Sequence, residues 1–291
     1  MPELPEVETI RRTLLTGPSA PLRAGASAGL RAGNRTAPGL VGQRIVGVSL
    51  RWPRHIVAPS PSSFRRRIRG QTIQDVSRRG KFIHIPLDRD SLLVHLMMSG
   101  DLFISPAGIA RGRHDHTIFQ LESGWQLRFS DSRKFGRVFL VPDPEEVLGS
   151  LGPEPLSDEF NTPDLLRILH YRRRSLKPLL IDQAAIAGLG NIYADESLHR
   201  ARLHPRRGSH TLEKAEVKAL WNGIRAALRD GLRHNGASID WVYRGGDFQN
   251  HFRVYGRAGQ PCPRCGTAIE RTIVGQRSTY TCPLCQPWKA S

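Results

Sequence analysis

Residues 262–285 read CPRCGTAIERTIVGQRSTYTCPLC and contain all four cysteines of the 291-residue chain. The spacing C-x2-C-x16-C-x2-C is that of a ribbon whose four thiolates bind one metal ion. Two disulfides could use the same cysteines, but an intracellular chain disfavours that alternative. The intervening residues predict a β-hairpin with Arg277 at its turn. We therefore predict one structural zinc ion, bound by Cys262, Cys265, Cys282 and Cys285.

Helical periodicity marks the residues from 164 to 234, upstream of this ribbon. Aliphatic side chains recur every four residues between Leu220 and Leu232, which predicts one long helix. Residues 188–191, GLGN, predict a glycine turn that leads into a second helix, IYADESLHRA. The free N–H groups at a helix start can bind phosphate, although such a turn is more often a plain helix terminus.

Residues 43–140 have a different texture, in which short apolar runs alternate with turn residues. The runs are RIVGVSL, TIQDVS, KFIHIPL, LLVHL, DLFIS, HTIFQL, WQLRFS and GRVFLV. Their alternation and β-branched content predict the strands of a β-sandwich or barrel. Residues 142–163 hold several prolines and many acidic side chains, so we expect a hinge between two domains there.

The N-terminal residues predict a helix followed by an insertion. Val7, Ile10 and Leu14 lie at helical spacing, and the acidic residues before and between them favour a helix start. Residues 17–39 consist largely of Ala, Gly, Pro and Arg, without periodicity and without an acidic residue. We expect this segment to be a flexible surface insertion.

The charge of the chain points to a polyanionic partner. Lys and Arg number 43 against 26 Asp and Glu, which gives a formal net charge of +17. This charge favours nucleic acid; association with a ribosome or with an anionic membrane surface is the alternative, but no basic amphipathic helix stands out. The chain has no apolar run long enough for a membrane helix, and MPELPEVET lacks the features of a signal peptide. We therefore expect a cytoplasmic protein with no membrane partner.

The start of the chain, MPELPEVE, carries two candidate catalytic groups. Removal of Met1, which we expect before a small residue such as Pro2, would leave a secondary amine at the chain terminus. This amine can attack a sugar C1′ and form an iminium, and Glu3 beside it can move protons. Terminal Pro-Glu pairs are usually inert, however, so the residues alone leave both interpretations open.

The chain resembles the bacterial formamidopyrimidine-DNA glycosylases in several motifs that occur in the same order. The motifs are MPELPEVE, HLMMSG (95–100), HDH (114–116), DSRKFGR (131–137), LGPEPL (151–156), GLGNIYADE (188–196), VYGR (254–257) and the four cysteines. The resemblance implies a multidomain α+β fold. An N-terminal β-sandwich with an N-terminal helix precedes a C-terminal helix-two-turn-helix domain with a zinc-ribbon hairpin. We expect domains at 1–142, 164–256 and 257–291, with the hinge at 143–163.

The same resemblance implies roles for individual residues. Pro2 is implied to be the nucleophile, Glu3 the general acid/base, and Glu6 a supporting group. Lys81 resembles a strand lysine near the lesion and its phosphate, and the alternative is that it is one cation among many. The residues implied to contact DNA are His95, Met98, His114, Arg133, Lys134, Phe135, Lys177, Asn191 and Arg277. The two histidines lie in strand-like runs, where histidine is often purely structural.

Three of these residues are implied to act when a base leaves the DNA helix. The enzyme must fill the gap and support the unpaired partner base. The resemblance assigns this task to Met98, Arg133 and Phe135. Met is deformable, Phe stacks as a wedge, and Arg can hydrogen-bond to the unpaired cytosine.

A further segment, residues 237–253, corresponds to the loop that closes over the extruded base. Its Gly245-Gly246 pair suits a mobile lid. Two residues depart from the family pattern. Met97 stands where glycine is common, and Lys134 stands where arginine is frequent, which keeps the charge but loses the bidentate geometry.

Three functions are consistent with these features. The first is a bifunctional glycosylase and abasic-site lyase that excises oxidised purines, such as 8-oxoguanine and formamidopyrimidines, from duplex DNA. The second is an enzyme of the sister endonuclease VIII group, which prefers oxidised pyrimidines; PELPE in place of PEGPE disfavours it. The third is a non-catalytic zinc-ribbon protein, which leaves the Pro2-Glu3 start unexplained. We expect the first, acting as a monomer on nucleoid DNA that contains oxidised bases or abasic sites.

Overall fold

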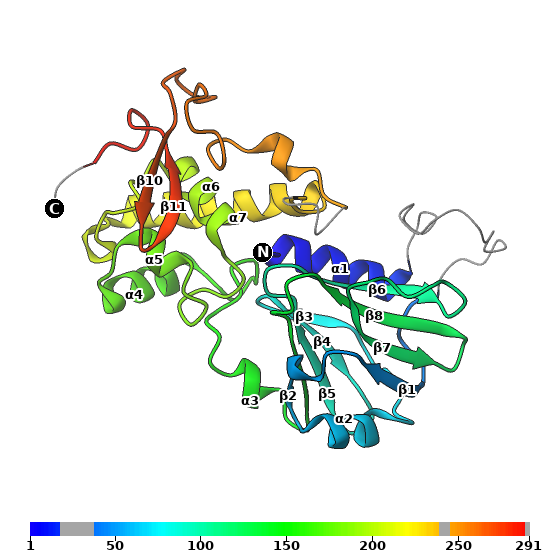
Figure 1. The fold of residues 1–291 in the computed structure, drawn as a ribbon. Coiled ribbons are helices and arrows are strands. Elements are labelled where there is room, and N and C mark those ends of the chain that lie inside the picture. Colours follow the sequence, from blue (N-terminus) through cyan, green and yellow to red (C-terminus); the bar gives the residue numbers. More distant parts are fainter. Residues whose placement is uncertain (18–37, 239–244, 289–291) are drawn as a thin grey trace. The chain divides into compact units, whose positions relative to one another are not determined.

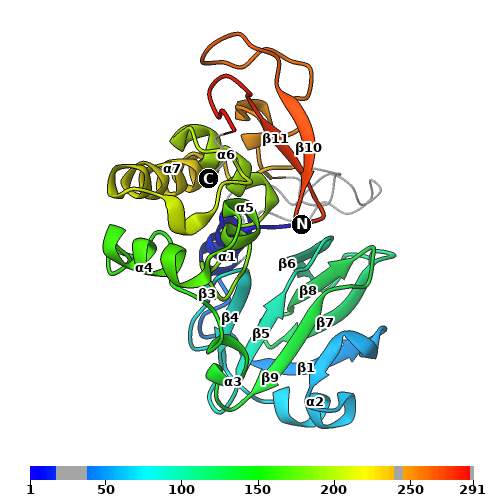
Figure 2. The same ribbon diagram turned by 90° about the vertical axis from the view of Figure 1, so that its left-hand side faces the viewer.

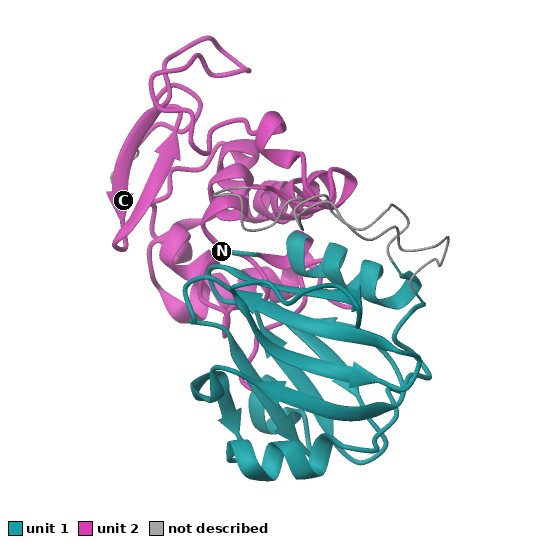
Figure 3. Cartoon of the chain, turned by 45° about the vertical axis from the view of Figure 1, so that its right-hand side comes forward, with its two compact units in different colours: residues 1–2, 6–149, 240–244 teal, residues 3–5, 150–239, 245–291 magenta. Residues whose placement is uncertain are grey.

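The structure is a computed structural model that describes residues 1–17, 38–238 and 245–288. Its described residues form two compact units (Figure 3). Unit 1 contains residues 1–2 and 6–149, and unit 2 contains residues 3–5 and most of the chain from 150 onward. Residues 18–37 of the predicted insertion (17–39) and residues 239–244 of the predicted loop (237–253) lie outside the described residues.

Unit 1 is built from two β-sheets (Figures 1 and 2). The antiparallel four-stranded sheet has the order β1-β7-β8-β6, and the five-stranded sheet has the order β2-β9-β5-β4-β3. The strands are β1 (Ile45–Leu50), β2 (Ile56–Ala58), β3 (Ser77–Arg79), β4 (Phe82–Pro86), β5 (Ser91–His95), β6 (Gly100–Pro106), β7 (Asp115–Leu121), β8 (Trp125–Asp131) and β9 (Arg137–Val141). Two separate sheets rather than one closed sheet identify a sandwich, so the predicted β-sandwich is confirmed and the barrel is excluded.

One apolar core holds unit 1 together. It contains side chains of both sheets, such as Phe129 of β8 and Leu140 of β9. Helix α1 (Leu4–Thr16) adds Val7, Ile10 and Leu14 to this core, as their spacing predicts. The chain also forms the helices α2 (Pro61–Ile68) and α3 (Glu145–Leu148) and the 3-10 turn η1 (Pro53–His55).

One predicted strand of unit 1 is wrong. The run TIQDVS, residues 72–77, makes only isolated bridges at Thr72 and Ile73, and β3 begins at its last residue. The reason lies in Asp88, whose carboxylate accepts the backbone N–H of Thr72 at 2.7 Å and the side-chain amide of Gln74 at 2.6 Å. These bonds, from a residue 14 to 16 positions further along the chain, take the place of part of the ladder that the apolar pattern predicts.

Unit 2 consists of helices and one hairpin. Its elements are α4 (Thr162–Arg172), α5 (Leu176–Leu180), α6 (Asn191–Ala201), η2 (Ser209–Thr211), α7 (Lys214–Arg233), η3 (Phe248–His251), β10 (Glu270–Val274) and β11 (Arg277–Thr281). Helix α6 is the centre of this unit, since nearly all of its residues are buried. The long helix α7 packs against α6, and Leu220, Ile224 and Leu228 of its predicted aliphatic face lie in the shared core.

The hairpin β10–β11 forms between the two cysteine pairs, as predicted. Ile269, Val254, Cys262 and Cys282 form a small separate core beside it. Four apolar residues bury too little surface to hold such a module alone, so a metal ion is the expected additional constraint. Within the described part of the chain, no helix combines the length and the apolar character that crossing a membrane requires.

Candidate functional site

Glu3 lies at the start of helix α6. Its carboxylate accepts the backbone N–H of Ile192 at 3.0 Å and that of Tyr193 at 3.4 Å. Gly190 leaves room for this carboxylate, because a Cβ at that position would lie 2.4 Å from Cδ of Glu3 and would displace the side chain. The positive end of a helix favours such an anion. The predicted glycine turn therefore does form an anion site, but the protein's own carboxylate occupies these two N–H groups instead of a phosphate.

The other implied catalytic residues belong to unit 1. Pro2 and Glu6 are buried, and Lys81, which follows the turn at Gly80, is 5% exposed. Strands β4 and β5 place Lys81 near His95, because Phe82 pairs with His95 across the ladder. Burial, with the nearby charges of Lys81 and Arg137, lowers the pKa of His95 to about 4.

His95 is therefore a neutral ring at neutral pH. Its Nδ1 accepts the backbone N–H of Met97 at 3.0 Å. The proton of a neutral imidazole then resides on Nε2, which is a donor. This tautomer lets His95 donate a hydrogen bond to a phosphate oxygen without carrying a charge.

The loop that carries Met98 and the loop that carries Arg133 and Phe135 are tied together. The hydroxyl of Ser99 donates to the carboxylate of Asp131 and accepts the backbone N–H of Arg133 at 3.1 Å. Asp131 also accepts the backbone N–H of Gly136 at 2.7 Å. Both loops are thus held at their bases by one buried carboxylate, which brings the three predicted residues into one region of unit 1.

The side chains on these loops point to solvent. Met98 is 39% exposed and Phe135 48% exposed, although apolar side chains of this size are usually buried. The guanidinium of Arg133 lies 5.1 Å from the centre of the Phe135 ring. Gly136 cannot carry a side chain, because its Cβ would lie 2.2 Å from the buried ring of Phe129. The loop therefore has a rigid base and an exposed apolar and cationic tip.

A cavity of about 370 Å³ opens beside the second loop in unit 1. Its lining includes Trp52, Arg113, His114 and Lys134. The ammonium of Lys134 lies 4.3 Å from the centre of the Trp52 ring, a cation–π contact. Lys134 thus has a specific partner where the family often has arginine, and Trp52 is a site residue that the sequence interpretation missed.

Lys177 is buried in unit 2, contrary to what a direct grip on the DNA backbone requires. Its side chain is fully buried and its Nζ lies 2.7 Å from Oδ1 of Asp195. Nζ also donates to the carbonyl of Ser278 at 2.8 Å, and Nδ2 of Asn191 donates to the same carbonyl at 3.0 Å. Burial lowers the pKa of Lys177 and raises that of Asp195.

The predicted contact of Lys177 with the DNA backbone stays a prediction, and the structure gives the side chain partners inside the protein. Its ammonium is engaged inside the protein, where it orients the zinc hairpin against α6. Arg277, the first residue of β11, lies directly before Ser278 and stays exposed. Lys177 and Asn191 thus position the strand that presents Arg277.

Helix α6 supplies two further anchors that the sequence interpretation missed. Asp195 accepts the backbone N–H of Tyr280 in the hairpin at 3.0 Å. Oε1 of Glu196 accepts the consecutive backbone N–H groups of Arg253, Val254 and Tyr255 at 2.9, 2.9 and 3.1 Å. The two carboxylates are adjacent in a helix that is almost entirely buried, and a buried carboxylate requires partners.

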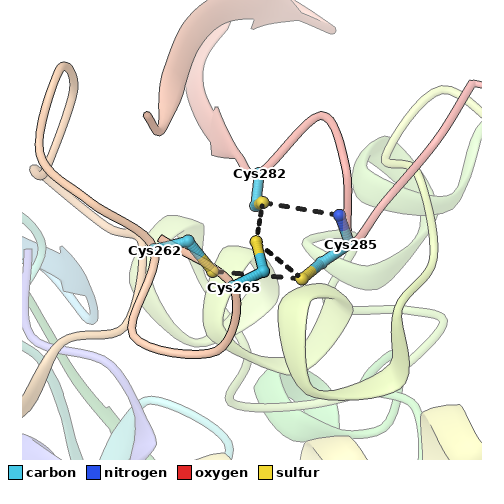
Figure 4. A group of neighbouring side chains, drawn as sticks. All are labelled: Cys262, Cys265, Cys282 and Cys285. Carbon is cyan, nitrogen blue, oxygen red and sulfur yellow. Dashed lines mark hydrogen bonds between the residues drawn. The ribbon is translucent and has the colours of Figure 1, made fainter. Parts of the chain in front are cut away.

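The four cysteine Sγ atoms form one cluster (Figure 4), with all four within 4.8 Å of one another. The separations include 4.0 Å for Cys262–Cys285 and 3.4 Å for Cys265–Cys282. They resemble the roughly 3.8 Å edge of a tetrahedral zinc–thiolate site and exceed the roughly 2 Å of a disulfide. Four soft thiolates in this arrangement fit zinc and fill all four of its coordination positions. The zinc ion therefore has a structural role.

A buried histidine supports this cluster. Nε2 of His199, on α6, lies 3.3 Å from Sγ of Cys262. Backbone N–H groups also point at the sulfurs, from Arg264 to Cys262 at 3.5 Å and from Cys285 to Cys282 at 3.4 Å. Such bonds orient metal-binding thiolates, and His199 joins the zinc module to the helical core.

Three family models match the chain in order. The model described as Formamidopyrimidine-DNA glycosylase N-terminal domain matches residues 31–138, and the model described as Formamidopyrimidine-DNA glycosylase H2TH domain matches residues 151–242. The model described as Zinc finger found in FPG and IleRS matches residues 259–287. The last match and the cysteine cluster confirm the predicted zinc site.

Individual relatives match over the full length. The formamidopyrimidine-DNA glycosylase of Herpetosiphon aurantiacus is 41% identical over 295 residues, which cover 98% of this chain and 100% of the relative. A structure of MutM with DNA that contains carbocyclic 8-oxo-G has a TM-score of 0.84 and 32% identity, and covers 99% of this chain and 100% of its own. The structure of Lactococcus lactis FPG (MutM) with FAPY-dG DNA has a TM-score of 0.84 and 32% identity, with coverages of 98% and 100%. The implied fold is therefore confirmed, and the chain belongs to the formamidopyrimidine-DNA glycosylase family.

Proposed function

We propose that this protein excises oxidised purines from duplex DNA and then cleaves the strand at the resulting abasic site. The observation that carries the proposal is the pair of tied loops, which hold Met98, Arg133 and Phe135 exposed on a rigid base. Two relatives of known structure are described as bound to DNA with 8-oxo-G and with FAPY-dG. The net charge of +17 supports a DNA substrate.

The proposed nucleophile is the secondary amine of Pro2. Met1 must be removed first, because an amide nitrogen is neither basic nor nucleophilic. The amine attacks C1′, the damaged base departs with a proton, and the opened sugar remains attached to Pro2 as an iminium. The iminium acidifies the C2′ proton, so its loss expels the 3′ phosphate, and a second elimination expels the 5′ phosphate.

Glu3 is proposed to move protons during these steps. Its two N–H bonds from α6 orient the carboxyl group and allow little rotation, as a general acid/base requires. Lys81 and the neutral ring of His95 are proposed to contact the phosphates at the lesion, with Glu6 as a supporting residue. Arg277, at the hairpin, and His114, at the cavity, are proposed further contacts to the DNA backbone.

The exposed loops are proposed to replace the extruded base. Phe135 wedges between base pairs, Met98 fills the gap, and Arg133 hydrogen-bonds to the unpaired partner. The cation–π contact between Arg133 and Phe135 holds both side chains together before DNA arrives, which lowers the entropy cost of ordering them. We place this activity in the cytoplasm, on the nucleoid, in a monomer.

Borohydride trapping tests the nucleophile and the substrate class together. Protein lacking Met1 is mixed with duplexes that carry 8-oxoguanine opposite cytosine, and borohydride should yield a covalent adduct that mass spectrometry places on Pro2. Protein that retains Met1 is the matched control and should give no adduct at this nitrogen. A duplex with an oxidised pyrimidine should react more slowly. Trapping on Lys81 with Pro2 unmodified would overturn the assignment, and faster excision of the pyrimidine would assign the chain the other specificity.

A further inference from the structure

A second group of metal-ligand side chains lies in unit 2, apart from the cysteine cluster. Ligand atoms of His234, Asp247 and His251 all lie within 4.8 Å of one another. His234 follows the last residue of α7. Asp247 directly precedes the 3-10 turn η3, and His251 is the last residue of that turn. Two imidazoles and a carboxylate form the three-residue ligand set typical of sites for divalent transition metals.

The three side chains are also in contact with one another. The rings of His234 and His251 stack with their centroids 3.7 Å apart. Nε2 of His251 lies 3.1 Å from the carboxylate of Asp247. The ligand atoms are close enough to surround one ion once the two stacked rings turn apart, so that their nitrogens face the same point.

The surrounding structure holds His234 in place. Its ring stacks on the buried ring of Phe248 at 6.3 Å, and Phe248 stacks on Tyr193 at 5.3 Å. Behind the histidine is therefore a column of aromatic rings that starts on α6. In contrast, Asp247 and His251 are exposed to solvent, so an ion can reach the site directly.

Backbone bonds join the two segments that carry the ligands. The N–H of Asp247 donates to the carbonyl of His234 at 2.9 Å, and the N–H of Phe248 donates to the carbonyl of Gly236 at 3.0 Å. Gly246 approaches Gly236 so closely that a Cβ on it would lie 2.1 Å from the Gly236 oxygen. The two segments thus form a paired stem, and the ligands lie on both of its sides.

We propose that His234, Asp247 and His251 bind one divalent transition-metal ion, such as Zn²⁺, with water in the remaining coordination position. The ion joins the end of α7 to η3 across the paired stem. It differs from the cysteine-bound zinc in its nitrogen and oxygen ligands and in its access to solvent. We expect this site to bind zinc more weakly than the cysteine site does. It supplies two neutral imidazoles and one carboxylate, whereas the cysteine site supplies four negatively charged thiolates.

Zinc uptake by untagged protein, purified with its cysteine site loaded, tests this site. Equilibrium dialysis against micromolar Zn²⁺ should raise the zinc content from one ion per chain to two. His251→Gln and His234→Asn should each weaken the second binding event more than about tenfold, since even the loss of a supporting partner costs 10–100-fold. His210→Gln, at an exposed histidine of the same unit, is the matched control and should bind two ions.

Two further measurements place the ion. Zn²⁺ should slow the hydrogen exchange of the amides of Asp247 and Phe248, which pair across the stem, and should leave those of the β-sandwich unchanged. Co²⁺ at this site should add weak ligand-field absorption bands without the intense bands of a cobalt–thiolate site. Asp247→Asn provides an independent variant if a histidine variant melts earlier than the wild type without added metal.

The outcomes separate the proposal from its alternatives. A zinc content that stays at one ion per chain, or a second ion that all three ligand variants retain, would overturn the site. Loss of the second ion in the ligand variants, with retention in His210→Gln, would establish it. Neither result depends on the glycosylase activity, so this test and that of the proposed function can fail separately.

Discussion

The buried ion pair of Lys177 and Asp195 allows a sharp test of how unit 2 is held together. Both side chains are fully buried, and their charged atoms are 2.7 Å apart. Lys177→Met would leave the carboxylate of Asp195 with the hydrogen bond from the backbone N–H of Tyr280. Asp195→Leu would leave the ammonium of Lys177 with the carbonyl of Ser278. Each single substitution therefore strands a charge in a medium of low polarity.

The magnitude follows from this geometry. Removal of one partner from a buried pair typically costs about 3–5 kcal/mol, because the remaining charge keeps its desolvation cost without its counter-charge. The double variant Lys177→Met/Asp195→Leu strands no charge and fills similar volume with apolar atoms. It should therefore cost less than either single variant, which corresponds to a coupling free energy of about 3 kcal/mol or more. Lys218→Met, on the exposed side of α7, should change stability by less than about 0.5 kcal/mol.

Urea unfolding at neutral pH, followed by hydrogen exchange in peptides from α5, α6 and the hairpin, would measure these free energies within unit 2. A parallel titration with duplex DNA would measure affinity. The structural role predicts that Lys177→Met loses stability first and DNA affinity as a consequence, and that the double variant recovers much of both. If Lys177→Met unfolds at the same urea concentration as Lys218→Met but binds DNA weakly, the lysine grips phosphate directly and the reasoning from its burial is refuted.

Three other predictions concern separate parts of the chain. Burial lowers the pKa of His55 to about 4. Between pH 6.5 and 4 the histidine is therefore protonated in the unfolded chain but not in the folded protein. The free energy of unfolding should decrease by up to about 3 kcal/mol as the pH is lowered through this window. Urea titrations should show a flatter pH dependence for His55→Gln, and an unchanged dependence would contradict the assignment. Phe135→Ala should slow excision from duplex DNA but should lower the free energy of unfolding by well under the roughly 3–5 kcal/mol typical of a core phenylalanine. Cleavage assays and thermal melts of the same protein would measure both effects. A stability loss of roughly 3–5 kcal/mol would make Phe135 a core residue. Chelation of the cysteine-bound zinc should weaken DNA binding, because the hairpin that presents Arg277 loses its anchor, and a metal-free protein with full affinity would contradict this.

Much of the architecture could be predicted because its signals are local. The four cysteines identify a zinc ribbon by spacing alone, and both pairs lie in tight knuckles whose geometry depends on a few neighbouring residues. The glycine turn before α6 and the aliphatic spacing of α7 likewise depend on residues within one or two helical turns. The exception is TIQDVS, where Asp88 binds the backbone from a distance of more than ten residues and removes a predicted strand.

The site residues could be named by resemblance, but their tasks depended on contacts across the chain. Nothing in the local sequence shows that Glu3 binds the start of α6, which is 189 residues away, or that Ser99 and Asp131 join two loops that the sequence separates by 32 residues. Lys177 carried the same signal as any other lysine in a basic chain, and only its burial beside Asp195 showed that its charge is used inside the protein. The sequence by itself therefore determined the elements, the metal ligands and the family, since these follow from neighbouring residues and motif order. The tertiary structure alone decided which charges are paired and which remain available to DNA, because pairing depends on distances in space that no spacing along the chain encodes.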